Sequence, residues 1–150
     1  MLEAIRQAGL NLETGEGGPF GAVVVKDGKI IAATGNRVTS TNDPTAHAEI
    51  VAIREACAKL ETFDLSGCEI FASCEPCPMC LGAVMWARVD KLYFAADRSD
   101  AAVAGFDDEL FYEELQLPYE HRSLPVEQLL QDEAVQIFDQ WIEKEDKIEY

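Results

Sequence analysis

The alternation of apolar and polar positions in the first third of the chain predicts a helix followed by a hairpin. Apolar residues at near-helical spacing predict a short helix over residues 1–10. A glycine-rich loop follows, and residues 20–26 and 29–33 then read as strands. The two strands flank Asp27 and Gly28, a dipeptide that strongly favours a tight hairpin turn. We therefore expect two antiparallel strands here.

The next segment predicts an amphipathic helix. Asn42 or Asp43 is a suitable N-cap, with Pro44 near the first helical position. An apolar stripe then recurs at steps of three and four, formed by Ile50, Ile53, Cys57 and Leu60.

The remaining pattern predicts a strand–helix–strand unit and then more helix. Residues 68–73 and 91–96 read as strands on either side of a mostly apolar helix, residues 77–87, which predicts a parallel pair with a right-handed crossover. Further along, we expect helices over residues 109–115 and 126–144, with a last strand in HRSLP, residues 121–125. The fold class is α/β, a three-layer α/β/α sandwich around a mixed sheet.

Length and composition fit a single globular domain over residues 1–150. Of 150 residues, 48% are hydrophobic and 27% are charged, so a core can form without disulfides. No apolar run predicts a signal peptide or a membrane span, and we expect a cytoplasmic protein with reduced cysteines and no membrane partner. The formal charge of −16 repels phosphate backbones, which disfavours nucleic acid and favours a small-molecule substrate.

Three thiols lie at even intervals in SCEPCPMC, namely Cys74, Cys77 and Cys80. Such a set is compatible with a disulfide framework, a redox pair or metal ligands. A chain with a sufficient core and an odd total of five cysteines does not fit a disulfide framework. Cys57 and Cys68 are interpreted as small buried apolar residues.

A histidine and a carboxylate complete a metal-site pattern. His47 and Glu49 lie two residues apart, so they share a site only if His47 stands at the ragged start of its helix. Cys77 and Cys80 lie one turn apart at the start of the next helix, after Pro76. Unpaired N–H groups at both helix starts favour thiolate, and thiolate sulfur with imidazole nitrogen is the ligand set that Zn²⁺ prefers.

Three protein ligands leave a tetrahedral zinc open to water, as in catalytic sites. Water bound to such a zinc ionises near neutral pH, and Glu49 can take its proton and pass it on as a general acid–base. H-x-E followed by P-C-x-x-C is the signature of zinc deaminases, in whose chemistry hydroxide attacks a ring carbon that bears an amino group and the carboxylate is not a zinc ligand. Taken separately, H-x-E often occurs by chance, and C-x-x-C occurs by chance or in redox proteins. The alternative to an enzyme is a structural zinc module that binds a partner, which would need Cys74 as a fourth ligand.

Beyond these motifs, the chain resembles the cytidine-deaminase-like superfamily, and within it the bacterial guanine deaminases. The resemblance covers nearly the whole chain, and the segments that carry it are GGPFGAVVVKDG, NDPTAHAEIVAIR, SCEPCPMCLGA, WAR, AGFDDELFYEE and the last two residues, EY. It implies a five-stranded mixed sheet and a homodimer that exchanges a C-terminal segment, about residues 108–150. The helix over residues 1–10 is short for this family.

The resemblance also implies site residues. Zinc ligands would be His47, Cys77 and Cys80, with Glu49 as proton shuttle; substrate contacts would come from Phe20, Asn36, Ala48, Trp86, Asp108 and Tyr150. Ordinary roles remain open for several of these residues. Phe20 and Trp86 could simply pack in the core, and Asn36 could form a turn. Asp108 could cap a helix or lie on a solvated face.

The implied activity is hydrolytic deamination of guanine to xanthine and ammonia. Deamination of another base, such as adenosine in tRNA or cytosine, stays open as the alternative.

Overall fold

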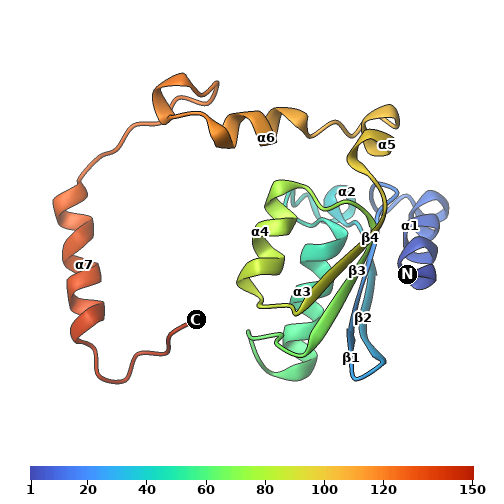
Figure 1. Cartoon of the computed structure of the whole chain (residues 1–150), viewed down its shortest axis with the longest axis horizontal. Coiled ribbons are helices and arrows are strands. Elements are labelled where there is room, and N and C mark those ends of the chain that lie inside the picture. Colours follow the sequence, from blue (N-terminus) through green and yellow to red (C-terminus); the bar gives the residue numbers. More distant parts are fainter. The chain divides into compact units, whose positions relative to one another are not determined.

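The computed structural model describes residues 1–150, which form two compact units, Met1–Glu109 and Leu110–Tyr150. The first unit contains a β-sheet between helices, and the second is helical (Figure 1). No helix in the chain combines the length and the apolarity needed to cross a membrane.

Four strands form one mixed sheet in the order β2-β1-β3-β4. Their bounds are β1 Gly21–Lys26, β2 Lys29–Gly35, β3 Cys68–Cys74 and β4 Lys91–Ala96. β1 is antiparallel to both of its neighbours, while β3 and β4 are parallel. The predicted hairpin turn is confirmed, with both Asp27 and Gly28 at positive φ.

Helices cover both faces of this sheet (Figure 1). α1 (Leu2–Thr14) lies on one face, while α3 (Ala48–Leu60) and α4 (Pro78–Trp86) lie on the other. The core between the sheet and α3 includes Val24, Ala32, Ala52, Leu65 and Ile70, all at most 1% exposed. This confirms an α/β fold with a mixed sheet. Three of the four residues in the apolar stripe predicted for α3 pack against this core, namely Ile53, Cys57 and Leu60.

Shorter elements and the second unit complete the chain. α2 (Val38–Thr41) and α5 (Arg98–Val103) were not predicted. α6 (Glu109–Gln116) agrees with its prediction, whereas α7 (Gln131–Glu143) starts five residues later than expected. A single 3₁₀ turn, η1, covers Tyr119–His121.

The sheet has four strands, so the expected five-stranded sheet and the expected strand at residues 121–125 are wrong. The N–H of Ser123 donates to the Glu114 carboxylate at 3.0–3.1 Å, and the N–H of Arg122 donates to the Tyr119 carbonyl. These donors are used within the second unit and pair with no strand. A segment of five residues does not reveal from its sequence that its backbone is bound locally in this way.

Two helix starts and ends also differ from expectation. α3 begins at Ala48, and Asp43 forms a turn in which its carboxylate accepts from the N–H and hydroxyl of Thr45. The predicted N-cap at Asn42 or Asp43 is therefore wrong. α1 extends to Thr14 and ends at Gly15, whose left-handed conformation terminates the helix.

Candidate active site

His47 stands immediately before α3, in the position that the sequence required of it. Its backbone is extended, with φ −64° and ψ 156°, and it serves as the N-cap, while its carbonyl accepts from the N–H of Val51. Glu49 is the second helical residue. Since His47 is outside the helix, its ring is free of the helical spacing that would turn it away from Glu49.

The second helix start presents the two thiols. Cys77 is the N-cap of α4 with an extended backbone, Pro78 is the first helical residue, and Cys80 follows in the first turn. Proline suits this position because its missing N–H would have no helical partner there. Cys77 was expected inside the first turn with Pro76 at the entry, so the helix starts one residue later than predicted.

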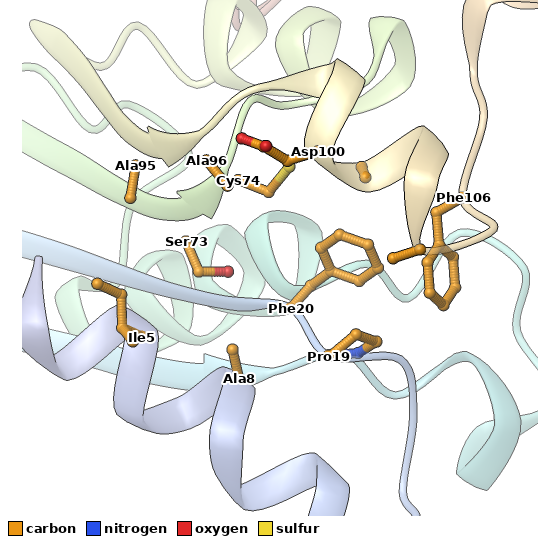
Figure 2. A pocket seen from close by; sticks show the side chains of 12 residues that line it. Ile5, Ala8, Pro19, Phe20, Ser73, Cys74, Ala95, Ala96, Asp100 and Phe106 are labelled. Atoms are coloured by element: carbon orange, nitrogen blue, oxygen red, sulfur yellow. The ribbon is translucent and has the colours of Figure 1, made fainter.

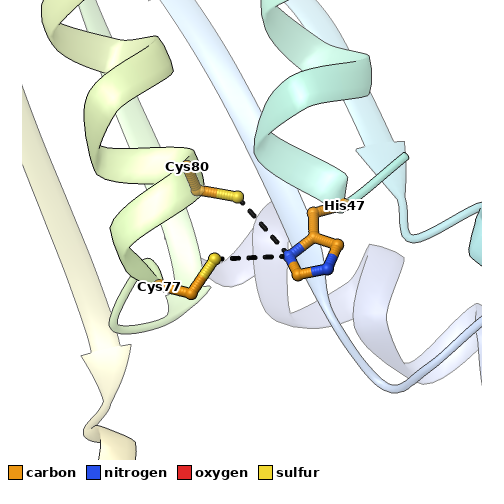
Figure 3. A group of neighbouring side chains, drawn as sticks. All are labelled: His47, Cys77 and Cys80. Carbon is orange, nitrogen blue, oxygen red and sulfur yellow. Dashed lines mark hydrogen bonds between the residues drawn. The ribbon is translucent and has the colours of Figure 1, made fainter. Parts of the chain in front are cut away.

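The two helix starts meet at a cluster of three metal-binding side chains (Figure 3). Nδ1 of His47 lies 3.6 Å from Sγ of Cys77 and 3.5 Å from Sγ of Cys80. A tetrahedral zinc with ordinary Zn–N and Zn–S lengths would separate nitrogen and sulfur by about 3.6 Å. The donor types and their spacing both fit zinc. These three residues would hold the ion and leave one tetrahedral position for another ligand.

Glu49 lies against this cluster and is almost completely buried. Only 7% of it is exposed, and the Cys80 thiol donates to its Oε2 at 3.4 Å. Burial, the largest influence, raises the pKa of the Glu49 carboxyl above its usual value. A buried carboxylate beside an open metal position can exchange protons with a molecule bound there.

The pKa values of the two thiols are shifted in opposite directions. The hydrogen bond from Cys80 is the largest influence that lowers the pKa of Cys77, to about 4, and the same bond raises the pKa of Cys80. The hydrogen bond between His47 and Cys77 raises the pKa of His47. One thiolate is thus stabilised in the cluster even before a metal binds, as expected at a helix N-terminus.

Cys74, the third thiol of the motif, is not in the cluster. It ends β3, is 8% exposed and donates to the Asp97 carbonyl at 3.5 Å. Burial raises its pKa to about 11. It therefore remains a thiol at neutral pH and has a backbone partner of its own.

Three residues predicted to contact substrate come from the loops around β1 and β2 and the start of α3. Asn36 is 5% exposed, and its Oδ1 accepts from the N–H groups of Gly18 and Val38 at 3.2 and 3.0 Å. Ala48 is fully buried, and its carbonyl accepts from the Thr34 hydroxyl at 2.9 Å. Phe20, just before β1, packs partly against the core.

An aromatic neighbour of Phe20 was missed from the sequence. The ring of Phe106 meets that of Phe20 edge to face, with centroids 4.9 Å apart. Both rings line a mostly apolar cavity of about 380 Å³ that is bordered by α1, α5 and the ends of β3 and β4 (Figure 2). None of the three cluster residues lines this cavity. The AGFDD segment, singled out only by resemblance, carries Phe106.

The other three residues predicted to contact substrate differ in how far they are buried. Asp108 is half-buried, and burial followed by the charge of Cys77 raises its pKa, which is an electrostatic link to the cluster. Trp86 ends α4 with 67% of its surface exposed. Tyr150 belongs to the second unit and is 71% exposed. The substrate roles of all three stay predictions.

Comparisons with known proteins agree with this geometry. The family described as "Cytidine and deoxycytidylate deaminase zinc-binding region" matches residues 1–96. Guanine deaminase of Bacillus subtilis (strain 168) is 50% identical over 150 residues, covering 100% of this chain and 96% of that protein. The chain belongs to this family of zinc-binding deaminases.

Solved structures and a second relative extend the comparison. The crystal structure of Bacillus subtilis guanine deaminase matches with a TM-score of 0.96 and 49% identity, covering 99% of this chain and 95% of that one. A protein solved in complex with 2,6-diaminopurine matches with a TM-score of 0.67 and 43% identity, covering 70% and 59%. A tRNA-specific adenosine deaminase of Aquifex aeolicus (strain VF5) is 47% identical over 93 residues, covering 62% of this chain and 61% of that protein.

Proposed function

We propose that this chain catalyses the hydrolytic deamination of guanine to xanthine and ammonia. The observation that carries the proposal is the cluster of His47, Cys77 and Cys80 with a buried Glu49 beside it. Zinc held by these three ligands would lower the pKa of a water molecule to about 7, so that the water can attack the amino-bearing carbon at neutral pH.

The reaction requires two proton movements, and Glu49 is placed for both. As a carboxylate it accepts one proton of the attacking water and delivers it to a ring nitrogen; it then accepts the remaining proton, from the hydroxyl on the attacked carbon, and delivers it to the departing amine as the C–N bond breaks. Its burial excludes bulk water, and the raised pKa favours the protonated form that the second transfer needs. No other carboxylate is buried among the described side chains.

The base would be held by the residues around the cluster. Because the Oδ1 of Asn36 accepts from two backbone donors, its Nδ2 is the group that remains to donate to an oxygen or nitrogen of the purine. The N–H of Ala48, at the first position of α3, is a second donor. Asp108 offers an acceptor for a ring N–H, and Phe20 an apolar wall.

Two observations favour guanine over a base in tRNA. The match to the guanine deaminase covers the whole chain at 50% identity, whereas two tRNA-specific adenosine deaminases match 62% of the chain at 47% identity and 89% of it at 39% identity. In addition, the charge of −16 repels the phosphates of a folded RNA. Free guanine carries no phosphate and is not subject to this repulsion.

A substrate panel tests the proposal. Zinc-loaded protein would be incubated separately with guanine, adenine, cytosine and a tRNA anticodon stem-loop, and ammonia would be measured in each. Release of ammonia from guanine, well above the other three, is expected. Ammonia from one of the others with none from guanine would refute the choice of substrate.

We also propose a homodimer in which the segment of about residues 108–150 is exchanged between subunits. No residue of the second unit is buried, although it has several large apolar side chains. On α7 these include Val135, Phe138, Trp141 and Ile142, which are 41–67% exposed. Apolar surface on this scale is normally covered by another protein surface. The cytoplasmic location expected from the sequence stays a prediction.

A further inference from the structure

Asn11, on α1, has a buried amide that the proposed chemistry does not use. Four polar or charged residues are buried: Asn11, Thr34, Asn36 and Glu49. Asn36 and Glu49 belong to the candidate site. Thr34 supports it, because its hydroxyl donates to the Ala48 carbonyl. Asn11 is 4% exposed, and asparagine has a poor helix propensity, so it does not owe its place to helix formation.

The Asn11 side chain joins α1 to the site loop. Its Nδ2 donates to the Gly18 carbonyl at 2.8 Å and to the Asn36 carbonyl at 2.9 Å. Both partners are acceptors, so the orientation of the Asn11 amide follows from the network itself. The bond to Asn36 is fully buried, which makes an unpaired carbonyl there costly.

Gly18 and Asn36 are also joined to each other and to Phe20 by hydrogen bonds. Gly18 donates its N–H to Oδ1 of Asn36, and Asn36 donates its own N–H to the Phe20 carbonyl at 3.0 Å. Asn11, Gly18 and Asn36 therefore form a closed set of hydrogen bonds. The set fixes the backbone that carries Phe20 and the direction of the Asn36 amide.

Tight packing leaves this set little freedom to rearrange. A Cβ at Gly35 would lie 2.6 Å from Oδ1 of Asn11, and a Cβ at Gly17 would lie 2.2 Å from the Asn36 carbonyl oxygen. Only glycine permits the backbone to approach so closely at these points. A displaced Asn11 side chain would therefore displace the Asn36 backbone as well.

We propose that Asn11 is a positioning residue for purine binding, which acts by holding Asn36 and the residue 15–20 loop in the orientation that receives the base. Nδ2 of Asn36 has no hydrogen bond in the chain, and no fully buried side-chain nitrogen or oxygen lacks a partner. This Nδ2 is therefore open to a ligand. The inference rests on the proposed function, because it assigns Asn36 to the purine.

Steady-state kinetics test the inference with a near-isosteric variant. Asn11→Asp keeps the shape but turns an oxygen toward two carbonyls, and Asn11→Ala is the second variant if the first fails to fold. We expect the KM for guanine to rise about tenfold or more while kcat stays within about twofold, since the effect is on binding of the base. Zinc content should be unchanged. An unchanged KM in an active, folded variant would overturn the inference.

A control variant and a double variant separate positioning from loss of stability. Ala4→Gly weakens α1 without a contact to Asn11, and we expect it to leave the KM unchanged. Asn11→Asp combined with Asn36→Ala should have the KM of Asn36→Ala alone, because Asn11 acts through Asn36. Multiplicative effects, or an equal rise in Ala4→Gly, would show that Asn11 has only a structural role.

Hydrogen exchange gives a readout that needs no activity. In Asn11→Asp, the amides of residues 15–20 and 36–41 should exchange faster, while those of α3 and α4 should not change. Unchanged exchange in the first two segments would overturn the inference whatever the substrate is. A wild-type protein that releases no ammonia from guanine would instead refute the proposed function.

Discussion

At the scale of single residues, proton affinity distinguishes the three thiols of SCEPCPMC. Beside His47 the pKa of Cys77 is lowered to about 4 and that of Cys80 is raised, whereas Cys74 is a buried thiol with a backbone partner. The even spacing in the sequence does not reveal this difference. It arises because α4 begins between Cys74 and Cys80, with Cys77 as its N-cap.

Zinc content should separate the ligands from the neighbouring thiol. We expect about one zinc per chain in the wild type and in Cys74→Ser, and little zinc in Cys80→Ser, because only the latter removes a ligand. Elemental analysis after dialysis against a weak chelator measures this. Loss of the metal from Cys74→Ser would mean that Cys74 is a fourth ligand and would favour a structural site.

Metal-free protein should contain one unusually reactive thiol. The folded pKa of Cys77 is lowered from 9.0 to about 4, so its thiolate is present at neutral pH and is lost only as the pH falls through about 4. The pKa of Cys57 is raised by burial, so this thiol stays protonated. Iodoacetamide at neutral pH should label Cys77 first, as followed by peptide mass spectrometry, and added zinc should protect it. Faster labelling of Cys57 would contradict this electrostatic account.

At the scale of elements, the sequence predicted most reliably where local chemistry determines the backbone. The hairpin follows from its turn residues, Asp27 and Gly28, and the parallel pair β3–β4 follows from the helix between the two strands. The start of α3 was misplaced because Asp43 and Pro44 suit a helix start and a turn equally well. His47 nevertheless lies at the start of α3, which is the position that the site prediction required of it.

Two glycines offer a matched test of how α1 packs on β1. A Cβ at Gly21 would lie 2.2 Å from the Ala4 carbonyl oxygen, so Gly21→Ala should push α1 outward and lower the free energy of unfolding by about 1–3 kcal/mol. Gly9, exposed on α1, has open space around it, and Gly9→Ala should raise this free energy by about 1 kcal/mol. Urea denaturation measures both. Equal effects in the two variants would contradict the packing described for α1.

At the scale of the whole molecule, the prediction of the second unit was right for its two helices and wrong for its strand. The expected strand at residues 121–125 is absent, and Arg122 and Ser123 make bonds within their own unit. Short-range patterns describe local structure, but they do not show what covers the apolar side chains of α7. In the zinc cluster, by contrast, each half carries its own motif.

The proposed dimer predicts a specific mass in solution. Sedimentation equilibrium should give twice the chain mass of 16.6 kDa, because the apolar residues of the second unit need a covering surface. A paired substitution on α7, Phe138→Glu with Trp141→Glu, should shift the protein to monomer. A wild-type monomer at micromolar concentration would rule out the exchanged dimer.

The central claim is that Glu49 moves protons in the deamination of guanine, at a zinc held by His47, Cys77 and Cys80. Xanthine formation at matched zinc content tests this claim most directly. Wild type and Glu49→Gln would be loaded to equal zinc and given guanine, with xanthine and ammonia measured together. We predict equal amounts of the two products from the wild type and a rate about 10²–10⁴-fold lower in Glu49→Gln. Absence of xanthine from the wild type, or a variant rate close to that of the wild type, would contradict the account.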